Sequence, residues 1–253
     1  MSVYIEERGQ GDAAMLLLHG FGATGAVWRR AVIELVDMWT GRIVVCDLPG
    51  HGRSAALATY SYPSVAETIA RATPPCESLV VVGHSFGGVI ATMLASGRYG
   101  VEPDAVVASS VKVTWSAEEL AGFATLVSKP VRWFTSRGEA EDRYRKVSGL
   151  TVDVTDDPAD LERGVCEDDQ RFRLSYDPAA GAVGAPGMAA ALADADCVVL
   201  LSRGAKDPMV TKAELQAFGV ATVDIVDAGH NVHVEQPELF ARSVVEFVAD
   251  RTS

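Results

Sequence analysis

The 253-residue chain has few cysteines, and they form no pattern. Cys46, Cys76, Cys166 and Cys197 are scattered, without a CxxC pair and without a histidine at metal-ligand spacing. Such a distribution indicates free thiols in a reducing compartment and argues against a disulfide framework or a zinc site. We therefore expect a protein that needs neither a metal nor another cofactor.

Long apolar runs are also missing. None approaches the roughly 18 residues that a membrane-spanning helix needs. The first residues, Met-Ser-Val-Tyr-Ile-Glu-Glu-Arg, lack the basic and apolar regions of a secretory signal. We expect a cytoplasmic protein that does not insert into a membrane.

Basic residues are scarce relative to acidic ones. The chain has 22 Lys and Arg against 34 Asp and Glu, which gives a formal net charge of −12. An acidic surface repels phosphate backbones and therefore disfavours nucleic-acid binding. The expected partner is a small-molecule substrate, and we expect a monomer or a homodimer.

Short apolar runs are present instead, and they alternate with helical patterns. The runs lie at residues 15–18, 43–46, 79–82, 105–108, 198–201 and 223–226, and the helical patterns at 24–37, 64–72, 86–98, 212–218 and 237–251. Each run is almost continuously apolar, as in strands that are covered by helices on both faces. This alternation predicts an α/β fold with a doubly wound, mostly parallel sheet.

The alternation stops between about residues 112 and 186. This stretch carries aromatic residues among charged ones, followed by Asp-rich and Gly/Ala/Pro-rich pieces, and it contains no good strand run. We predict a core of residues 1–111 and 187–253 and a mainly helical cap, residues 112–186, laid over the sheet.

The strongest single feature is the segment Val-Val-Val-Gly-His-Ser-Phe-Gly-Gly at residues 80–88. An apolar strand leads into a G-x-S-x-G sequence, and a helical pattern opens at Phe86. A sharp turn at this point presents the hydroxyl of Ser85 above the sheet. It needs small residues at Gly83 and Gly87 so that strand and helix can approach closely. We predict that Ser85 is a nucleophile.

A serine hydroxyl is a weak nucleophile at neutral pH and needs a base within hydrogen-bond reach. Asp207 and His230 each follow a predicted strand, as Ser85 does. Because the carboxyl ends of parallel strands gather at one edge of a sheet, three strand ends can bring these groups into one crevice. We predict that His230 is the base and that Asp207 orients it. His233, three residues further on, is the alternative base.

Three other carboxylates are weaker candidates for the acid. Asp47 ends a strand and is expected to fix its own loop through hydrogen bonds to the backbone. Asp224 falls inside a strand pattern. Asp227 lies on the same strand end as His230, where it is poorly placed to reach the imidazole ring.

Five segments together resemble the α/β-hydrolase superfamily, specifically its capped serine hydrolases. They are His-Gly-Phe-Gly at 19–22, Asp-Leu-Pro-Gly-His-Gly-Arg-Ser at 47–54, Gly-His-Ser-Phe-Gly-Gly at 83–88, Gly-Ala-Lys-Asp at 204–207 and Ala-Gly-His at 228–230. The resemblance implies a helical cap over an α/β core and a triad of Ser85, Asp207 and His230. Related epoxide hydrolases and dehalogenases carry Asp at the nucleophile position, so Ser85 argues against their chemistry.

The resemblance also implies two backbone donors for an oxyanion. In this fold one N–H belongs to the residue after the nucleophile, here Phe86, and the other to the loop after the first core strand, here Phe21. His19, His51 and His84 are expected to shape loops or to pack against their neighbours.

These features predict hydrolysis of a small or medium carboxylic ester through an acyl-enzyme. We expect an apolar pocket. Its candidate lining residues are Trp28, Trp115, Phe123, Trp133 and Phe134.

Two alternative functions stay open. The same triad serves a hydrolase or lyase that cleaves a C–C bond of a diketo or enol-type acid, with a basic residue such as Arg53, Arg132 or Arg143 fixing the carboxylate. The scaffold can also serve as a ligand-binding receptor, which an intact triad and two oxyanion loops disfavour.

Overall fold

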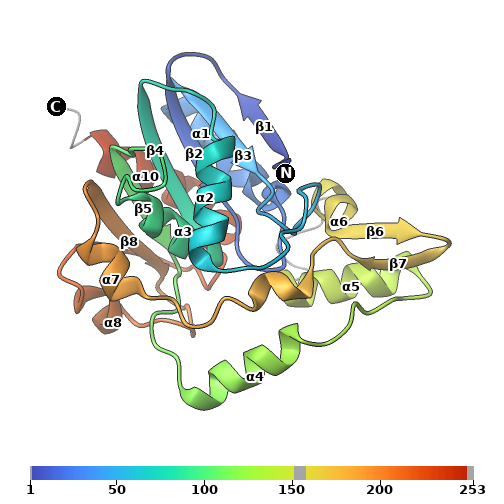
Figure 1. The fold of residues 1–253 in the computed structure, drawn as a ribbon. Helices are drawn as coiled ribbons and strands as arrows, with labels where there is room; N and C mark the ends of the chain where they lie inside the picture. Colours follow the sequence, from blue (N-terminus) through green and yellow to red (C-terminus); the bar gives the residue numbers. More distant parts are fainter. Residues whose placement is uncertain (1, 151–157, 250–253) are drawn as a thin grey trace.

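The computed structural model describes residues 2–150 and 158–249, and within them a seven-stranded sheet runs in the order β1-β3-β2-β4-β5-β8-β9 (Figure 1). Its strands are β1 (Ile5–Arg8), β2 (Ala13–Leu18), β3 (Arg42–Cys46), β4 (Ser78–His84), β5 (Ala105–Ser109), β8 (Val198–Gly204) and β9 (Ala221–Ile225). All neighbours pair in parallel except β1 with β3. The prediction of a mostly parallel sheet is confirmed.

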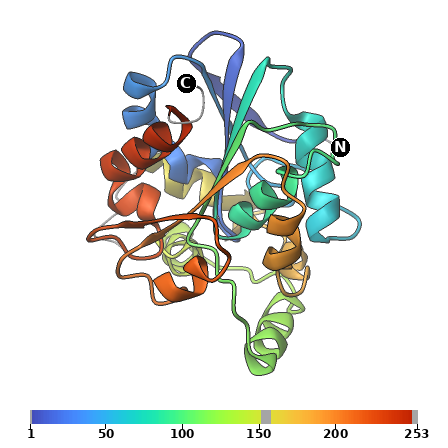
Figure 2. The ribbon, with the colours of Figure 1, turned by 90° about the vertical axis from the view of Figure 1, so that its left-hand side faces the viewer.

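Helices cover both faces of this sheet. They are the 3-10 helix η1 (Gly25–Trp28) and the helices α1 (Arg29–Met38), α2 (Tyr62–Ala72), α3 (Phe86–Leu94), α7 (Met188–Ala193), α8 (Lys212–Gln216), α9 (Val232–Glu235) and α10 (Pro237–Ala249). Helices α1 and α10 pack on one face and α2 and α3 on the other, so the sheet is seen nearly edge-on between them in Figure 2. The helical pattern predicted to end at residue 251 is described as far as Ala249, and its last two residues lie outside the described part.

The apolar residues of each central strand are divided between the two faces. In β2, Met15 and Leu17 belong to the core beneath α1 and α10, whereas Ala14, Leu16 and Leu18 belong to the core beneath α2 and α3. Side chains alternate along a strand, so a strand with helices on both sides must be apolar at every position. This is the physical reason why continuous apolar runs predicted the central strands correctly.

Capping side chains fix where several helices begin. Ser61, Ser116 and Thr211 each precede a helix and accept the N–H of the residue three positions later. The residue at that third position returns a side-chain oxygen to the N-cap backbone, so two otherwise unpaired donors are satisfied at each start.

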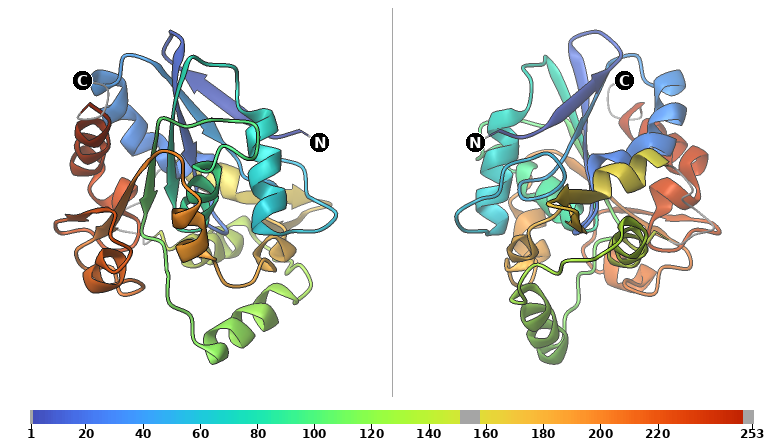
Figure 3. Two further views of the ribbon diagram at one scale, coloured as in Figure 1. Left: turned by 60° about the vertical axis from the view of Figure 1, so that its left-hand side comes forward. Right: turned by 90° about the vertical axis from the view of Figure 1, so that its right-hand side faces the viewer.

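The residues predicted to form the cap, 112–186, are called the cap segment below. Its elements are α4 (Ala117–Val127), α5 (Arg137–Ser148), α6 (Pro158–Gly164), β6 (Val165–Asp168), β7 (Arg171–Leu174) and the 3-10 helix η2 (Pro178–Gly181). The segment is mainly helical, and α4 and α5 lie beyond the ends of the core strands (Figures 1 and 3). Residues 151–157 of the predicted cap lie outside the described part.

Three strands were not predicted. The edge strand β1 reads Ile-Glu-Glu-Arg, and the hairpin strands β6 and β7 read Val-Cys-Glu-Asp and Arg-Phe-Arg-Leu. Each is short and largely polar because only part of it faces a core, so apolar runs cannot identify it.

Two features are missing from the described residues. None of the helices in this part of the chain is long and apolar enough to cross a membrane. In the same residues, no group of three or more His, Cys, Asp and Glu side chains is arranged to hold a metal ion.

Candidate active site

Ser85 occupies the sharp turn between β4 and α3. Its φ is 50° and its ψ is −112°, a conformation that residues with a side chain rarely adopt. A Cβ atom on Gly83 would collide with the carbonyl oxygen of Gly87, and one on Gly87 would lie 2.6 Å from the carbonyl oxygen of His19. Strand and helix are therefore in direct contact, and only glycine fits at these two positions.

Asp207 and His230 follow β8 and β9, and the structure brings them together. The Nδ1 atom of His230 lies 3.0 Å from Oδ2 of Asp207, and the carboxylate also accepts the N–H of Met209 at 2.8 Å. The Asp207 side chain is fully buried. Burial opposes ionisation, but the hydrogen bond and the charge of His230, together with the N–H of Met209, lower the pKa of Asp207 below its ordinary value.

The backbone around His230 is held from two sides. The carboxylate of Glu235 accepts the N–H of Gly229 at 2.6 Å and that of Asn231 at 3.0 Å. The ring of His84 donates its Nε2–H to the carbonyl oxygen of His230 at 2.8 Å. His84 therefore does more than pack against its neighbours, because it fixes the loop that carries His230.

His233, the alternative base, lies in a different environment. Its ring is 1% exposed and packs between Trp28 and His84, with ring centroids 4.3 and 4.5 Å apart. Burial lowers its pKa to about 3, and neither ring nitrogen has a hydrogen-bond partner in the described chain. His230, in contrast, is hydrogen bonded to the carboxylate of Asp207. This difference favours His230 over His233 as the base.

The weaker acid candidates have other partners. Asp47 accepts the N–H groups of Gly25 and Arg53 at 2.7 and 2.9 Å and so fixes its own loop. Asp224 pairs with Arg203 at 3.5 Å and with Lys212 at 3.3 Å, and Asp227 pairs with Lys206 at 2.8 Å.

The loop after β2 lies beside Ser85. A Cβ atom on Gly20 would lie 3.5 Å from Cβ of Ser85, and the N–H of Gly87 donates to the carbonyl of His19 at 3.1 Å. Phe21 and Phe86 both line the cavity described next, and in the described chain no hydrogen bond engages the backbone N–H of either. Both N–H groups are therefore available as donors.

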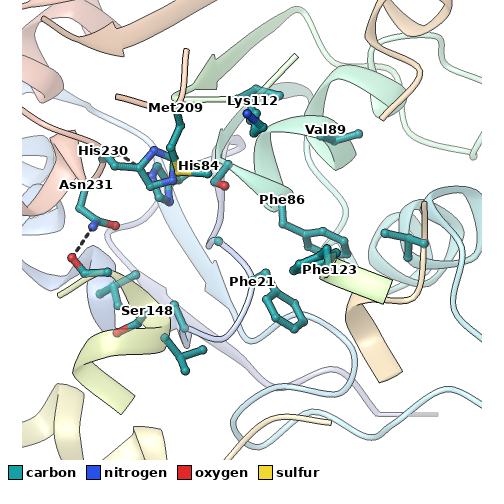
Figure 4. Close-up of a pocket in the computed structure, with 18 of the residues that line it drawn as sticks. Phe21, His84, Phe86, Val89, Lys112, Phe123, Ser148, Met209, His230 and Asn231 are labelled. Carbon is teal, nitrogen blue, oxygen red and sulfur yellow. Dashed lines mark hydrogen bonds between the residues drawn. The ribbon is translucent and has the colours of Figure 1, made fainter. Parts of the chain in front are cut away.

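A cavity of about 330 Å³ opens between the core and the cap segment, and Ser85 and His230 both line it. Phe21, Phe86 and Phe123 gather on one side of it, and His230 and His84 lie on the other (Figure 4). The lining is mostly apolar and includes the predicted Trp115 and Phe123. Its volume is at the lower end of the range for small-molecule sites.

Three of the residues predicted to line the pocket do not line this cavity. Trp28 is fully buried in the core against Phe240. Phe134 is 6% exposed and pairs its backbone with Phe172 of the hairpin, and the neighbouring Trp133 packs under the guanidinium of Arg171. The side chains of all three are occupied elsewhere, and none of them reaches the cavity.

Other lining residues were not predicted. Lys112, Met209 and Asn231 line the cavity, and Asn231 also donates to the carbonyl of Gly149 at 2.8 Å, shown by the dashed line in Figure 4. Each lies within a few residues of a strand end or of a predicted site residue. That position was the available signal, because sites in such sheets gather there.

Similar proteins fit this architecture. E-2-(acetamidomethylene)succinate hydrolase superimposes with a TM-score of 0.81 at 24% identity, over 98% of this chain and 95% of that one. A thioesterase domain from the curacin biosynthetic pathway superimposes with a TM-score of 0.77 at 19% identity, over 96% of this chain and 95% of that one. At such identities the likeness shows a shared fold.

A curated relative is the pimeloyl-[acyl-carrier protein] methyl ester esterase of Aeromonas hydrophila. It is 42% identical over 97 residues, which make up 38% of this chain and 36% of that protein. The match therefore spans about a third of the relative's length. A family model described as "Alpha/beta hydrolase family" matches residues 15–243, from β2 into α10. Together with the sheet order and the turn at Ser85, this match shows that the chain belongs to the alpha/beta hydrolase family.

Proposed function

We propose that the protein is a serine hydrolase that cleaves small or medium carboxylic esters through an acyl-enzyme. The observation that carries the proposal is the hydrogen bond between His230 and the buried Asp207, at a cavity that Ser85 also lines from its sharp turn. The methyl ester esterase of Aeromonas hydrophila, which is similar to this chain over 97 residues, supports ester hydrolysis as the reaction class.

In the first half of the reaction, Oγ of Ser85 attacks the carbonyl carbon of the ester while Nε2 of His230 takes the hydroxyl proton. Asp207 keeps the ring in the required tautomer and stabilises the imidazolium. The N–H groups of Phe21 and Phe86 donate to the oxyanion. The C–O bond then breaks, and His230 returns its proton to the departing alcohol.

In the second half, water replaces the alcohol. His230 takes a proton from this water, and the hydroxide oxygen attacks the acyl carbon. The bond to Oγ breaks, the proton passes from His230 to Ser85, and the carboxylic acid leaves. The mostly apolar lining, including Phe123 and Trp115, suits the hydrocarbon part of such a substrate.

A fluorophosphonate probe tests the proposal, because it reacts only with an activated serine. We expect labelling of the wild-type protein on the peptide that contains Ser85, and none in Ser85→Ala. Hydrolysis of 4-nitrophenyl butyrate should fall by about 10⁴-fold or more in the same variant. Ser243→Ala, on α10, is the matched control and should behave as the wild type. Wild-type turnover in Ser85→Ala would overturn the proposal.

Cleavage of a C–C bond in a diketo or enol-type acid is the second candidate. It needs a basic group for the substrate carboxylate, and the cavity contains Lys112 and Lys146. Arg132 and Arg143, considered for this role, line a separate groove in the cap segment. Activity on dienoate-type acids without activity on 4-nitrophenyl esters would favour this reaction.

A further inference from the structure

The charges that line the cavity are unlike those of the whole protein. Among the described residues, the lining contains two lysines, Lys112 and Lys146, but no Asp or Glu. The chain as a whole has 34 acidic residues against 22 basic ones. A lining with the average composition of this chain would contain carboxylates. Their absence from the cavity indicates a site that admits an anion.

Lys112 is the basic residue that the structure holds in place. It follows β5 by three residues, and its side chain is 18% exposed. Its Nζ lies 2.9 Å from Oε1 of Glu119 and 5.3 Å from the centre of the Trp115 ring. Figure 4 shows Lys112 at the edge of the cavity, between Met209 and Val89.

Glu119 is itself fixed, which makes it a rigid support for the ammonium group. Its other oxygen, Oε2, accepts the N–H of Ser116 at 2.9 Å in the capping box that starts α4. The indole N–H of Trp115 donates to the backbone carbonyl of Lys112 at 3.0 Å, and the Lys112 ammonium lies over the same indole ring. Trp115 thus contacts both the backbone and the side chain of Lys112. Lys112 therefore loses little conformational entropy when it binds a ligand.

The ammonium group keeps capacity for a second anion. It has three N–H donors, and Glu119 is its one ion-pair partner within the described residues. The Glu119 side chain is 48% exposed and does not line the cavity, so solvent screens part of its charge. A carboxylate inside the mostly apolar cavity is screened less and gains a charge-assisted hydrogen bond.

Lys146 does not fit this role as well. It lies on α5 at the exposed rim, and in the part of the chain that the structure describes no carboxylate holds its side chain. A solvated, mobile ammonium contributes little to binding.

We propose that Lys112 binds an ionised carboxylate of the substrate, so that the preferred esters carry a free carboxylate at the end of the chain away from the scissile bond. The inference rests on the proposed ester hydrolysis and names the class of its substrate.

The test compares pairs of esters that differ only in charge. Monomethyl glutarate, adipate and suberate are measured against methyl esters in which a carboxamide replaces the free carboxylate. The readout is the ratio of kcat/KM within each pair. Because both members are measured on one preparation, a loss of folded protein cancels in the ratio.

We expect the wild type to prefer the carboxylate by about tenfold at the best chain length, as for one charge-assisted hydrogen bond. Lys112→Met should reduce the ratio to about one. Glu119→Gln should raise it, because Gln can still cap α4 but no longer neutralises Lys112. Lys129→Met, in the separate groove of the cap segment, is the control and should leave the ratio unchanged.

The outcomes separate this inference from the function on which it rests. Absence of hydrolysis for every pair, together with absence of fluorophosphonate labelling, would refute the ester hydrolase itself. Hydrolysis of both members at equal kcat/KM would refute only the role of Lys112. A carboxylate preference that survives in Lys112→Met would also refute the role of Lys112. The same holds for a preference that disappears in Lys146→Met, and for one that fails to rise in Glu119→Gln.

Discussion

The backbone of Ser85 is strained, and the residues around it maintain that strain. A non-glycine residue with positive φ is held there only when its surroundings allow no alternative. At this turn the surroundings are the close contact of β4 with α3 and the hydrogen bond from the N–H of Ser85 to the carbonyl of Ser109, 2.8 Å long. The turn is therefore a property of the packed core.

Gly87→Ala should show how closely this turn is packed. The added Cβ would meet the carbonyl oxygens of Leu18 and His19, both of which belong to backbone that cannot move aside easily. We expect a loss of at least about 2 kcal/mol in the free energy of unfolding, measured by urea denaturation.

Gly122→Ala is the matched control for this experiment. Gly122 lies within α4, and nothing approaches its Cβ position within 4 Å. Alanine there should raise stability by roughly 0.5–1 kcal/mol, because it favours the helix. Equal stability changes in the two variants would contradict the proposed packing.

His230→Ala and His233→Ala should differ in kind. Removing His230 deletes the ring that is paired with Asp207, so kcat should fall by about 10⁴-fold or more with little change in Tm. Removing His233 leaves a cavity between Trp28 and His84, and we expect a loss of about 2–3 kcal/mol in stability. Near-normal turnover in His230→Ala would contradict the assignment of the base.

At the scale of elements, the short helix α9 positions the loop that carries His230. Glu235 on this helix accepts the N–H groups on both sides of His230, so one carboxylate determines where the ring sits relative to Asp207. Asn231 also joins this loop to the end of α5.

Glu235→Gln should therefore lower kcat while leaving KM nearly unchanged. An amide has one acceptor oxygen, so one of the two N–H groups loses its partner and the loop shifts. We expect about a tenfold loss in kcat and a slower reaction with fluorophosphonate. Glu238→Gln, in the first turn of α10 and exposed, is the control. An unchanged kcat in Glu235→Gln would show that the loop is held without it.

The core elements were more predictable from the sequence than the cavity lining. Runs such as residues 15–18 and 79–82 predicted central strands because burial on both faces requires continuous apolar residues. The turn at Ser85 was identifiable because it requires glycines at fixed positions on both sides of the serine, where a Cβ atom would collide with the backbone. These are local relations between sequence and geometry.

The lining depends on relations that are not local. Trp28 ends the 3-10 helix η1, and the direction of its side chain follows from how η1 joins α1. Trp133 and Phe134 are held by a hairpin whose strands have little apolar pattern. Composition alone therefore could not separate these aromatics from Trp115 and Phe123, which do line the cavity.

Buried neutral histidines are a feature of the whole molecule. Four of the five histidines, His19, His51, His84 and His233, are at most 3% exposed. Burial lowers the pKa of His19 to about 4 and those of His51 and His233 to about 3, and it brings that of His84 well below the ordinary value of 6.5. Additional repulsion among these rings acts in the same direction.

The protein should consequently lose stability in mild acid. Below pH 6.5 the unfolded chain takes up protons on these four histidines while the folded protein does not, so the free energy of unfolding falls as the pH falls toward 4. Each histidine contributes a slope of up to about 1.4 kcal/mol per pH unit. Urea denaturation between pH 7.5 and 5 measures the effect in a range above the ordinary pKa values of Asp and Glu. A free energy of unfolding that stays constant over this range would show that the four rings are protonated in the folded protein as readily as in the unfolded chain.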